Sequence, residues 1–283
     1  MINTSPDKSI KHSDIVRLSD FMIEETGIHL GPDKQALIEG RLHKRMRELA
    51  LPSFDVYMDY VFSPKGKSNE IIHLIDILTT NKTDFFREPN HFEYLMDSVI
   101  PEFKNEGEAG VRRALNVWSA GCSSGEEPYT LSILFNEFLE NNPWFRYQII
   151  ATDISTRVLD MAKKGVFEID KMSDVPLMYK RKYFLKGKGE NSNLAKAIPR
   201  LKSNILFGRI NLMEMPYPLD ITFDVIFCRN VIIYFKKPVQ EKVVNALSQK
   251  LRKGGYLFMG HSETLTGMDI PLERINSTVY RKL

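Results

Sequence analysis

The sequence predicts an α/β protein with a doubly wound, mostly parallel sheet, preceded by a small all-α domain. Three observations lead to this class. Apolar residues recur at helical spacing over residues 13–78, strand-like runs alternate with helical runs from residue 111 onward, and short β-prone runs interrupt that alternation over residues 165–208. Strands that alternate with helices are typical of a parallel sheet with helices on both faces.

Length and composition bound the class of protein further. With 283 residues the chain is long enough for one or two domains. A composition of 43% hydrophobic and 27% charged residues is that of a soluble globular protein, and a net charge of +3 is too small to favour nucleic acid as a partner. No run approaches the roughly 18 apolar residues of a membrane helix.

Cysteines, histidines and the first residues favour a cytoplasmic protein without a metal ion. Cys122 and Cys228 lie far apart in the sequence, as expected of free thiols in a reducing compartment. The histidines are scattered, without metal-ligand spacing. The first residues lack the basic and apolar segments of a signal peptide. Nothing in the pattern indicates a permanent dimer, so we expect a monomer.

A small helical domain is expected over residues 1–80. The apolar spacing predicts helices over Ser13–Thr26, Pro32–Leu49, Ser53–Phe62 and Asn69–Leu78. The second helix has a basic side, where Arg41, Lys44 and Arg45 share one face by the i, i+3, i+4 rule. This face is either an ordinary solvated surface or a docking surface for an acidic helical partner.

The stretch Thr79-Thr-Asn-Lys-Thr-Asp-Phe-Phe-Arg87 interrupts the helical pattern. Linkers seldom carry Phe-Phe-Arg, so we expect residues 81–110 to pack against the following domain and to lend polar groups to its site. A helix is expected from Pro89 to Phe103, and a loop rich in Gly and Glu over Asn105–Gly110.

The second domain is expected to span residues 111–283. Strands are predicted at Ala114–Trp118, Tyr147–Thr152, Phe223–Cys228, Tyr256–Met259 and Thr278–Arg281, and helices at Glu126–Glu140, Ser155–Lys164 and Pro238–Leu251. Gly254-Gly255 is predicted to cap the last helix. The final strand allows an antiparallel hairpin to close the sheet.

Residues 165–208 do not fit the alternation. Tyr183-Phe-Leu and Ile205-Leu-Phe are β-prone, and a polar turn over residues 186–193 lies between them. We expect a small antiparallel β-subdomain here, serving either as a recognition device or as a decoration of this lineage.

The stretch Asn116–Tyr129 predicts a ligand cradle, although an ordinary βα connection has the same pattern. Gly121 and Gly125 are spaced G-x-x-x-G, which is neither a dinucleotide fingerprint nor a P-loop, and Ser124 is expected to cap the following helix. Asp153 ends the second strand, where it either accepts hydrogen bonds from ribose hydroxyls or caps the next helix. An adenosine-containing ligand without pyrophosphate fits, with S-adenosylmethionine as the leading candidate.

Several motifs, in order along the chain, resemble the bacterial chemotaxis protein-glutamate methyltransferases of the CheR type. The motifs are Thr79-Thr-Asn-Lys-Thr-Asp-Phe-Phe-Arg-Glu, Val117-Trp-Ser-Ala-Gly-Cys-Ser-Ser-Gly-Glu-Glu-Pro-Tyr, Ala151-Thr-Asp-Ile, Phe223-Asp-Val-Ile-Phe-Cys-Arg-Asn-Val-Ile-Ile-Tyr-Phe and Gly260-His-Ser-Glu. The resemblance runs from about residue 14 to the C-terminus.

The resemblance implies a Rossmann-like methyltransferase domain that uses S-adenosylmethionine, with S-adenosylhomocysteine as the product. The acceptors would be glutamate side chains on the cytoplasmic helices of chemoreceptors. Carried over by position, the cofactor contacts are Asn81, Thr83, Arg87, Glu127, Asp153, Asn211, Leu212, Arg229 and Asn230. Arg87 and Tyr234 match the residues nearest the transferred methyl group. Arg41, Lys44 and Arg45 would then steer the acidic receptor helices.

In some members of this family the β-subdomain binds a C-terminal pentapeptide of the receptor as an added strand. The Leu185–Ile198 loop is as long as in those members, so the same partner is a candidate here. Two alternatives to the expected function remain. One is an S-adenosylmethionine enzyme with another acceptor, and the other is a signalling module that keeps the fold without catalysis.

Overall fold

The computed structural model describes residues 9–31 and 34–283. The chain forms two compact units, a helical domain that ends at Thr80 and an α/β domain that begins at Asn81. The short segment Tyr234–Lys236 groups with the helical domain although the residues on either side of it belong to the α/β domain. Among the described residues, no helix is both long enough and apolar enough to cross a membrane.

Within residues 9–31 and 34–80, the helical domain has one helix more than the sequence pattern predicts. Its helices are α1 (His12–Thr26), α2 (Gln35–Glu48), α3 (Phe54–Phe62), α4 (Pro64–Asn69) and α5 (Ile71–Leu78). The predicted helix start at Pro32-Asp33 lies outside the described residues. Helix α4 was not predicted because it has no apolar periodicity. Its signals are local, since Ser63 caps it by accepting a hydrogen bond from the amide of Gly66, and Pro64 occupies its first turn.

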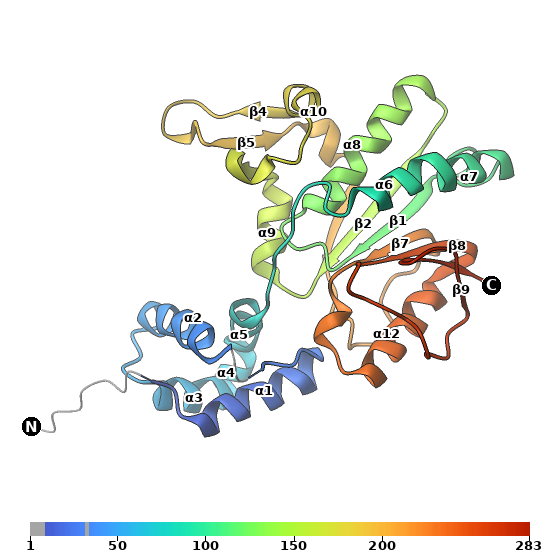
Figure 1. Ribbon diagram of the computed structural model, residues 1–283. Helices are drawn as coiled ribbons and strands as arrows, with labels where there is room; N and C mark the ends of the chain where they lie inside the picture. The colour runs from blue at the N-terminus through green and yellow to red at the C-terminus, as the bar shows by residue number, and fades with distance from the viewer. Residues whose placement is uncertain (1–8, 32–33) are drawn as a thin grey trace, which may run out of the picture. The chain divides into compact units, whose positions relative to one another are not determined.

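A seven-stranded sheet forms the centre of the α/β domain (Figure 1). Its strands are β1 (Leu115–Ala120), β2 (Tyr147–Asp153), β6 (Ile205–Arg209), β7 (Phe223–Cys228), β8 (Leu251–Met259), β9 (Leu272–Arg274) and β10 (Val279–Lys282). The order is β6-β2-β1-β7-β8-β10-β9. The first five strands are parallel, and β10 pairs antiparallel with both β8 and β9. The predicted class, with its closing hairpin, is confirmed. The order reverses between β1 and β7, where open α/β sheets bind ligands.

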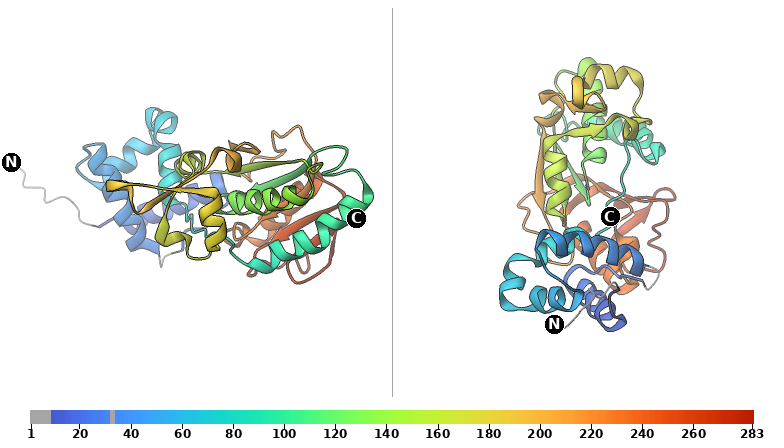
Figure 2. Two further views of the ribbon diagram at one scale, coloured as in Figure 1. Left: turned by 90° about the horizontal axis from the view of Figure 1, so that it is seen from above. Right: turned by 90° about the vertical axis from the view of Figure 1, so that its left-hand side faces the viewer.

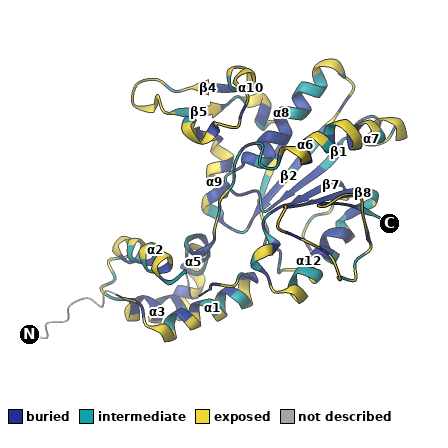
Figure 3. Cartoon of the chain, in the orientation of Figure 1, coloured by how far each residue is buried: buried dark blue, intermediate teal, exposed yellow. Residues whose placement is uncertain are grey.

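The buried strands account for the near-continuous apolar runs in the sequence. Figure 3 shows β1, β2 and β7 largely buried, and every residue of β7 is buried. Strands covered by helices on both faces have no polar side to present to solvent. The covering helices include α8 (Glu126–Asn141), α9 (Thr156–Lys164) and α12 (Lys237–Lys250).

The helix predicted over Pro89–Phe103 is present as three consecutive segments. These are α6 (Pro89–Tyr94), a π-helical turn η2 (Leu95–Val99) and α7 (Ile100–Glu106). Pro101 has no amide hydrogen to donate to the preceding turn, and this explains why the helix widens just before it.

Two local predictions about glycine and serine are wrong. Gly125 rather than Ser124 holds the N-cap position of α8, with a φ of +104°, while the Ser124 hydroxyl donates to the Glu126 carboxylate. Gly254-Gly255 does not cap α12, because β8 begins at Leu251 directly after that helix. A Cβ on Gly255 would lie 2.9 Å from the carbonyl oxygen of Asp224, so glycine is needed where these strands approach closely.

The β-subdomain is a separate three-stranded antiparallel sheet of order β3-β5-β4. It comprises β3 (Val166–Glu168), η3 (Ile169–Met172), α10 (Leu177–Tyr183), β4 (Phe184–Lys186), η4 (Gly189–Asn191), β5 (Leu194–Ala197) and α11 (Pro199–Lys202). Figures 1 and 2 show β4 and β5 protruding from the main sheet. The Ile205-Leu-Phe run is not part of it, because Ile205 pairs with Ile149 in the main sheet as the start of β6. Its β-propensity is visible in the sequence, but its partner strand is not.

Phe85 joins the linker segment to the β-subdomain. Its ring is buried and packs edge-on against Phe167 at 4.8 Å and against Phe184 at 5.8 Å between centroids. The polar interruption before the α/β domain is therefore anchored by its aromatic residues, as predicted for a segment that packs against that domain.

Candidate cofactor site

The chain leaves β1 through a tight turn at the carboxyl edge of the sheet, beside the point where the strand order reverses. The amides of Gly121 and Cys122 both donate to the carbonyl oxygen of Thr152, at 2.7 and 2.9 Å. Gly121 has a φ of +82°, and a Cβ there would lie 2.3 Å from the Val231 side chain. Glycine is therefore required where the loops after β1 and β7 approach each other.

Asp153 ends β2 and ties two loops together. It is only 8% exposed. Its Oδ2 accepts a hydrogen bond from the amide of Ser123 at 2.8 Å, and its Oδ1 accepts one from the amide of Ser155 at 2.9 Å. Ser155 caps α9 by accepting a hydrogen bond from the amide of Val158, so Asp153 is not the cap of that helix. The contact of Asp153 with a ribose stays a prediction.

The segment before α6 is hydrogen-bonded both to the turn after β1 and to helix α8. The Ser123 hydroxyl donates to the carbonyl oxygen of Asn81 at 2.9 Å, and the amide of Phe86 donates to the Thr130 hydroxyl at 3.1 Å. Thr130 lies on α8, so the segment crosses the start of that helix. Thr83 is half-buried on the same segment.

Arg87 is half-buried and belongs to this segment. Its guanidinium donates to the carbonyl oxygen of Lys82 at 3.1 Å, and its own carbonyl oxygen accepts a hydrogen bond from Arg229. The backbone of Arg87 is thus fixed to the end of β7, while its side chain stays on the linker segment.

Arg229 is a buried cation between two carboxylates. Its side chain is 2% exposed, with Nε 3.5 Å from Glu127 Oε2 and Nη2 3.6 Å from Glu88 Oε2. The guanidinium also lies over the rings of Phe92 and Phe227, at 5.2 and 5.9 Å from their centroids. In the described part of the chain, Nε and Nη1 of Arg229 make no hydrogen bond. Buried donors in this state are expected where a further polar group binds.

Glu127 lies at the start of α8 and faces both Arg229 and the strand. Its Oε1 accepts a hydrogen bond from the Ser119 hydroxyl at 2.7 Å. Burial raises the pKa of Glu127 above its ordinary value, while the charge of Arg229 and the hydrogen bond from Ser119 act against that rise. A buried acid in such a position is stabilised by a ligand that brings a positive charge.

Asn230 follows β7 and is held by two acids. It has a φ of +58°, which is uncommon for a residue other than glycine, and its amide donates to Glu263 Oε2 at 2.8 Å. Its side-chain Nδ2 donates to Glu88 Oε1 at 3.4 Å. The strained backbone is therefore compensated by hydrogen bonds on both sides.

Glu263 is the main support of this loop. The carboxylate accepts hydrogen bonds from five backbone amides, four of them consecutive. The donors are Asn230, Val231, Ile232, Ile233 and Gly260. A carboxylate with this many amide donors is well stabilised inside a protein.

Asn211 and Leu212 follow β6 and are joined to the cradle through the backbone. Both are buried, and the amide of the preceding residue, Ile210, donates to the carbonyl oxygen of Asp153 at 3.1 Å. Among the contacts of Asn211 are two within its own loop, with the amide of Met213 and the carboxylate of Glu214.

Tyr234 groups with the helical domain. Its carbonyl oxygen accepts a hydrogen bond from the amide of His29 at 3.1 Å, and the Lys34 ammonium lies 5.3 Å from its ring centroid. Arg87 and Tyr234, the predicted catalytic pair, thus belong to different units. Their joint role stays a prediction.

Two of the three predicted docking residues hold the helical domain together. Arg41 donates to the carbonyl oxygens of Ile77 and Thr79 at the end of α5, at 2.7 and 2.9 Å. Arg45 makes a bidentate pair with the buried carboxylate of Glu70, at 2.8 Å for each contact. Lys44 is exposed. Within this face, Lys44 is therefore the side chain best placed to meet a partner.

The sequence reasoning missed the acids that organise the site. Neither Glu88 nor Glu263 is marked by periodicity or spacing in the sequence. Glu88 binds Asn230, 142 positions away, and Glu263 binds the amide of Ile232, 31 positions away. The only signals were their places in two motifs of the family resemblance, Phe85-Phe-Arg-Glu and Gly260-His-Ser-Glu.

The residues at this edge fit S-adenosylmethionine, which carries a positive sulfur, an amino acid group and ribose hydroxyls. Asp153 and Glu127 supply carboxylate acceptors for hydroxyl and ammonium donors. The unsatisfied nitrogens of Arg229 suit a carboxylate. The positive φ of Gly121 lets the backbone turn without a side chain at the cradle.

Comparison with known proteins agrees with this fit. Residues 13–79 match the all-alpha domain of CheR methyltransferases, and residues 81–281 match their SAM binding domain. A chemotaxis protein methyltransferase of Borreliella burgdorferi is 34% identical over 287 residues, which cover 99% of this chain and 100% of that protein. Chemotaxis protein methyltransferase 2 of Pseudomonas aeruginosa is 35% identical, covering 94% of this chain and 92% of its own.

The chemotaxis protein methyltransferase of Escherichia coli is 33% identical over 264 residues, which cover 93% of this chain and 88% of that protein. Both family domains occur here in one chain, in order and over most of its length. The chain therefore belongs to the CheR family of S-adenosylmethionine-dependent methyltransferases.

Proposed function

We propose that this methyltransferase modifies glutamate side chains of chemoreceptors, forming glutamyl γ-methyl esters that serve adaptation in chemotaxis. The acceptor is supported by the shared name of the relatives, chemotaxis protein methyltransferase. The observation that supports the cofactor is the ion pair between Glu127 and the buried Arg229 at the carboxyl edge of the sheet, where the buried Asp153 ends β2.

The cofactor would be held by residues from several loops. S-adenosylmethionine, when bound, supplies a methyl group attached to a positively charged sulfur. Its proposed contacts are Asn81, Thr83, Arg87, Glu127, Asp153, Asn211, Leu212, Arg229 and Asn230. Glu127 favours a cationic group, Arg229 favours a carboxylate, and Asp153 favours hydroxyl donors.

The acceptor needs little chemical activation. A glutamate side chain with an ordinary pKa of about 4.3 is already ionised near neutral pH, so no general base has to remove a proton. What the protein must supply is position and exclusion of water. We assign Arg87 the role of holding one oxygen of the acceptor carboxylate, and Tyr234 the role of orienting the acceptor.

Docking of the receptor is proposed on the basic face of α2. Receptor helices that present glutamates are acidic, and an exposed cation raises the rate of encounter with them. Lys44 meets this requirement directly. Arg41 and Arg45 contribute positive potential from the positions in which they bind α5 and Glu70.

The β-subdomain is proposed as a second contact with the receptor. Strand β4 is an edge strand of the small sheet, since β5 lies between β3 and β4. An extended receptor C-terminus can add to such an edge as a further strand. Removing the receptor C-terminus should then lower the methylation rate without changing which residues are methylated.

The proposal is tested by methyl transfer to receptor-containing membranes with methyl-labelled S-adenosylmethionine. Label that is released as methanol by base indicates a carboxyl methyl ester, the expected result. Base-stable label would show another acceptor chemistry and would overturn the proposal.

The role of Arg87 has its own test. Arg87→Ala should reduce the rate of methyl transfer more than it weakens cofactor binding, because Arg87 is assigned to hold the acceptor in addition to being one of nine proposed cofactor contacts. The control is Arg112→Ala, which removes an exposed arginine whose ion pair with Glu108 is also exposed. Equal losses of rate and of cofactor affinity would contradict the assignment.

A further inference from the structure

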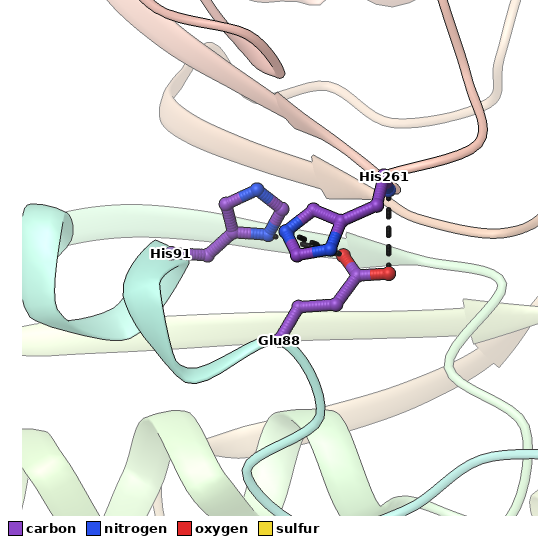
Figure 4. A group of neighbouring side chains, drawn as sticks. All are labelled: Glu88, His91 and His261. Atoms are coloured by element: carbon purple, nitrogen blue, oxygen red, sulfur yellow. Dashed lines mark hydrogen bonds and ion pairs between the residues drawn. The ribbon is translucent and has the colours of Figure 1, made fainter.

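Glu88, His91 and His261 form a cluster of ligating side chains, none of which is a proposed contact of the cofactor or the acceptor. Glu88 and His91 lie at the start of α6, and His261 follows β8 (Figure 4). One ligating atom from each side chain lies within 4.8 Å of the other two. Figure 4 shows the carboxylate and both imidazole rings turned toward one another.

The closest pair of ligating atoms in the cluster is one ring nitrogen of His91 and one carboxylate oxygen of Glu88. His91 Nδ1 lies 3.4 Å from Glu88 Oε2, and in the described part of the chain neither atom has a hydrogen-bond partner. The other ring nitrogen of His91, Nε2, is 2.6 Å from the Thr278 hydroxyl. We assign the ring proton to Nε2 because Nδ1 makes no hydrogen bond. The lone pair of Nδ1 then faces a carboxylate oxygen.

Both ligands at the start of α6 are shielded from solvent. The side chain of His91 is 2% exposed and that of Glu88 is 11% exposed. Buried polar atoms without a hydrogen bond, such as His91 Nδ1 and Glu88 Oε2, are expected where a further group binds.

The distances match those between two ligands of one tetrahedral metal ion. Ligands at about 2.05 Å from zinc are about 3.3 Å apart in a tetrahedral site. The separation of His91 Nδ1 and Glu88 Oε2 is 3.4 Å, and His261 Nε2 lies 4.0 Å from the same oxygen. The His261 side chain is 49% exposed, so it has room to close the remaining gap.

Two neighbours of the cluster bear on cation binding: Thr278 favours it and Arg229 opposes it. The hydrogen bond between His91 and Thr278 fixes the ring orientation, as outer contacts of metal-bound histidines do. Arg229 opposes a cation, since its Nη2 lies 3.6 Å from Glu88 Oε2. Its charge is shared with Glu127, however, so two carboxylates face one guanidinium.

We propose that Glu88, His91 and His261 bind a divalent transition-metal ion, with zinc as the ion of choice. Two imidazoles and one carboxylate suit zinc better than magnesium or calcium, which prefer oxygen ligands. Three protein ligands leave one position for water on the exposed side, beside His261. The proposal does not depend on the methyl acceptor, because the three ligands come from this chain alone.

The test is calorimetric titration of Zn²⁺ into the full-length chain without S-adenosylmethionine. The expected result is one saturable site per chain, and His261→Ala should weaken it by about tenfold or more. His73→Ala is the matched control, since His73 is an exposed histidine on α5 outside the cluster. Zn²⁺ should also raise the melting temperature of the wild type and of the control, and not that of His261→Ala.

Two results would overturn the proposal. One is the absence of a saturable site, or equal zinc affinity in His261→Ala and His73→Ala. The other is a nitrogen NMR spectrum of the metal-free protein near neutral pH in which both ring nitrogens of His91 are protonated. In that case, a buried imidazolium paired with Glu88 would explain the 3.4 Å contact instead.

Discussion

Two buried carboxylates, Asp153 and Glu263, hold the loops at the carboxyl edge of the sheet. Asp153 accepts hydrogen bonds from two amides, which belong to two different loops. Glu263 accepts hydrogen bonds from five amides, of which four are consecutive in Asn230–Ile233. Both side chains are less than 10% exposed.

The difference between the two acids separates support from ligand binding. Glu263 accepts its hydrogen bonds from backbone amides, four of them in one turn, and this marks it as a structural residue. Asp153 joins the ends of neighbouring strands at the position where an acid accepts ribose hydroxyls in such sheets. We therefore expect loss of Glu263 to reduce stability most, and loss of Asp153 to reduce cofactor affinity most.

The largest effect should follow Glu263→Gln. The substitution replaces one acceptor oxygen by an NH₂ group that faces backbone donors, and it removes the charge that strengthens the remaining bonds. We expect a loss of about 3 kcal/mol in the free energy of unfolding, measured with urea. Glu273→Gln, at an exposed position in β9, is the control and should change it by less than about 0.5 kcal/mol. A loss below about 1 kcal/mol for Glu263→Gln would show that the five amides are satisfied in another way.

Asp153→Asn should weaken cofactor binding by about tenfold to a hundredfold, because a neutral amide is a poorer acceptor and turns one donor toward the ligand. Titration calorimetry with S-adenosylhomocysteine measures this affinity. Asp160→Asn provides the control, since Asp160 is exposed on α9, beyond the same loop. Unchanged affinity in Asp153→Asn would remove Asp153 from the cofactor site.

Glu126 is a third buried acid, and its ionisation should make the stability of the protein depend on pH. Its pKa is raised from the ordinary 4.5 to about 6, chiefly by burial. The folded state therefore holds this proton more tightly than the unfolded state, so the contribution of Glu126 to stability falls as pH rises from 4.5 to about 6 and stays low above that. Glu126→Gln should raise the free energy of unfolding by about 1–2 kcal/mol near pH 7.5, and by much less near pH 4.5.

Thermal unfolding at the two pH values checks this expectation. Glutamine keeps an acceptor for the Ser124 hydroxyl, so the comparison isolates the charge. Equal stabilisation at both pH values would mean that packing, and not ionisation, causes the change.

The smallest effect is expected on the helical domain. There Arg45 is a structural residue that pairs with Glu70, whereas the exposed Lys44 is free to meet a partner. Lys44→Glu should lower the rate of receptor methylation by about twofold to fivefold at low salt, and the effect should shrink as salt screens the charge. Lys65→Glu, an exposed charge reversal on α4, is the control. A loss that does not depend on salt would exclude electrostatic steering by Lys44.

The parts of the fold that periodicity reveals were predictable from the sequence. Buried strands such as β7 read as continuous apolar runs, and Gly27 ends α1 in the left-handed conformation expected of a helix stop. The partner of a short strand is not encoded locally, which is why the sequence pattern predicts Ile205-Leu-Phe in the β-subdomain although it pairs with β2 in the main sheet. The same limit applies to Tyr234–Lys236, whose grouping with the helical domain depends on contacts with distant residues such as His29.

The candidate site was predictable where backbone geometry demands a residue type. Gly121 and Asp153 follow from the pattern of a strand, a turn and a helix, and the structure places them side by side through Ser123 and Thr152. Glu263 did not follow from any local pattern, because it acts on a loop about thirty residues away. Buried charges that support loops are specified by the tertiary structure.

The account is tested most directly by measuring S-adenosylhomocysteine affinity for Asp153→Asn and Glu263→Gln side by side, at a temperature where both variants are folded. We predict that Asp153→Asn loses affinity by about tenfold or more while Glu263→Gln stays within about threefold of the wild type. The reverse order, with Glu263→Gln losing more affinity than Asp153→Asn, would contradict the separation of support from ligand binding at this edge.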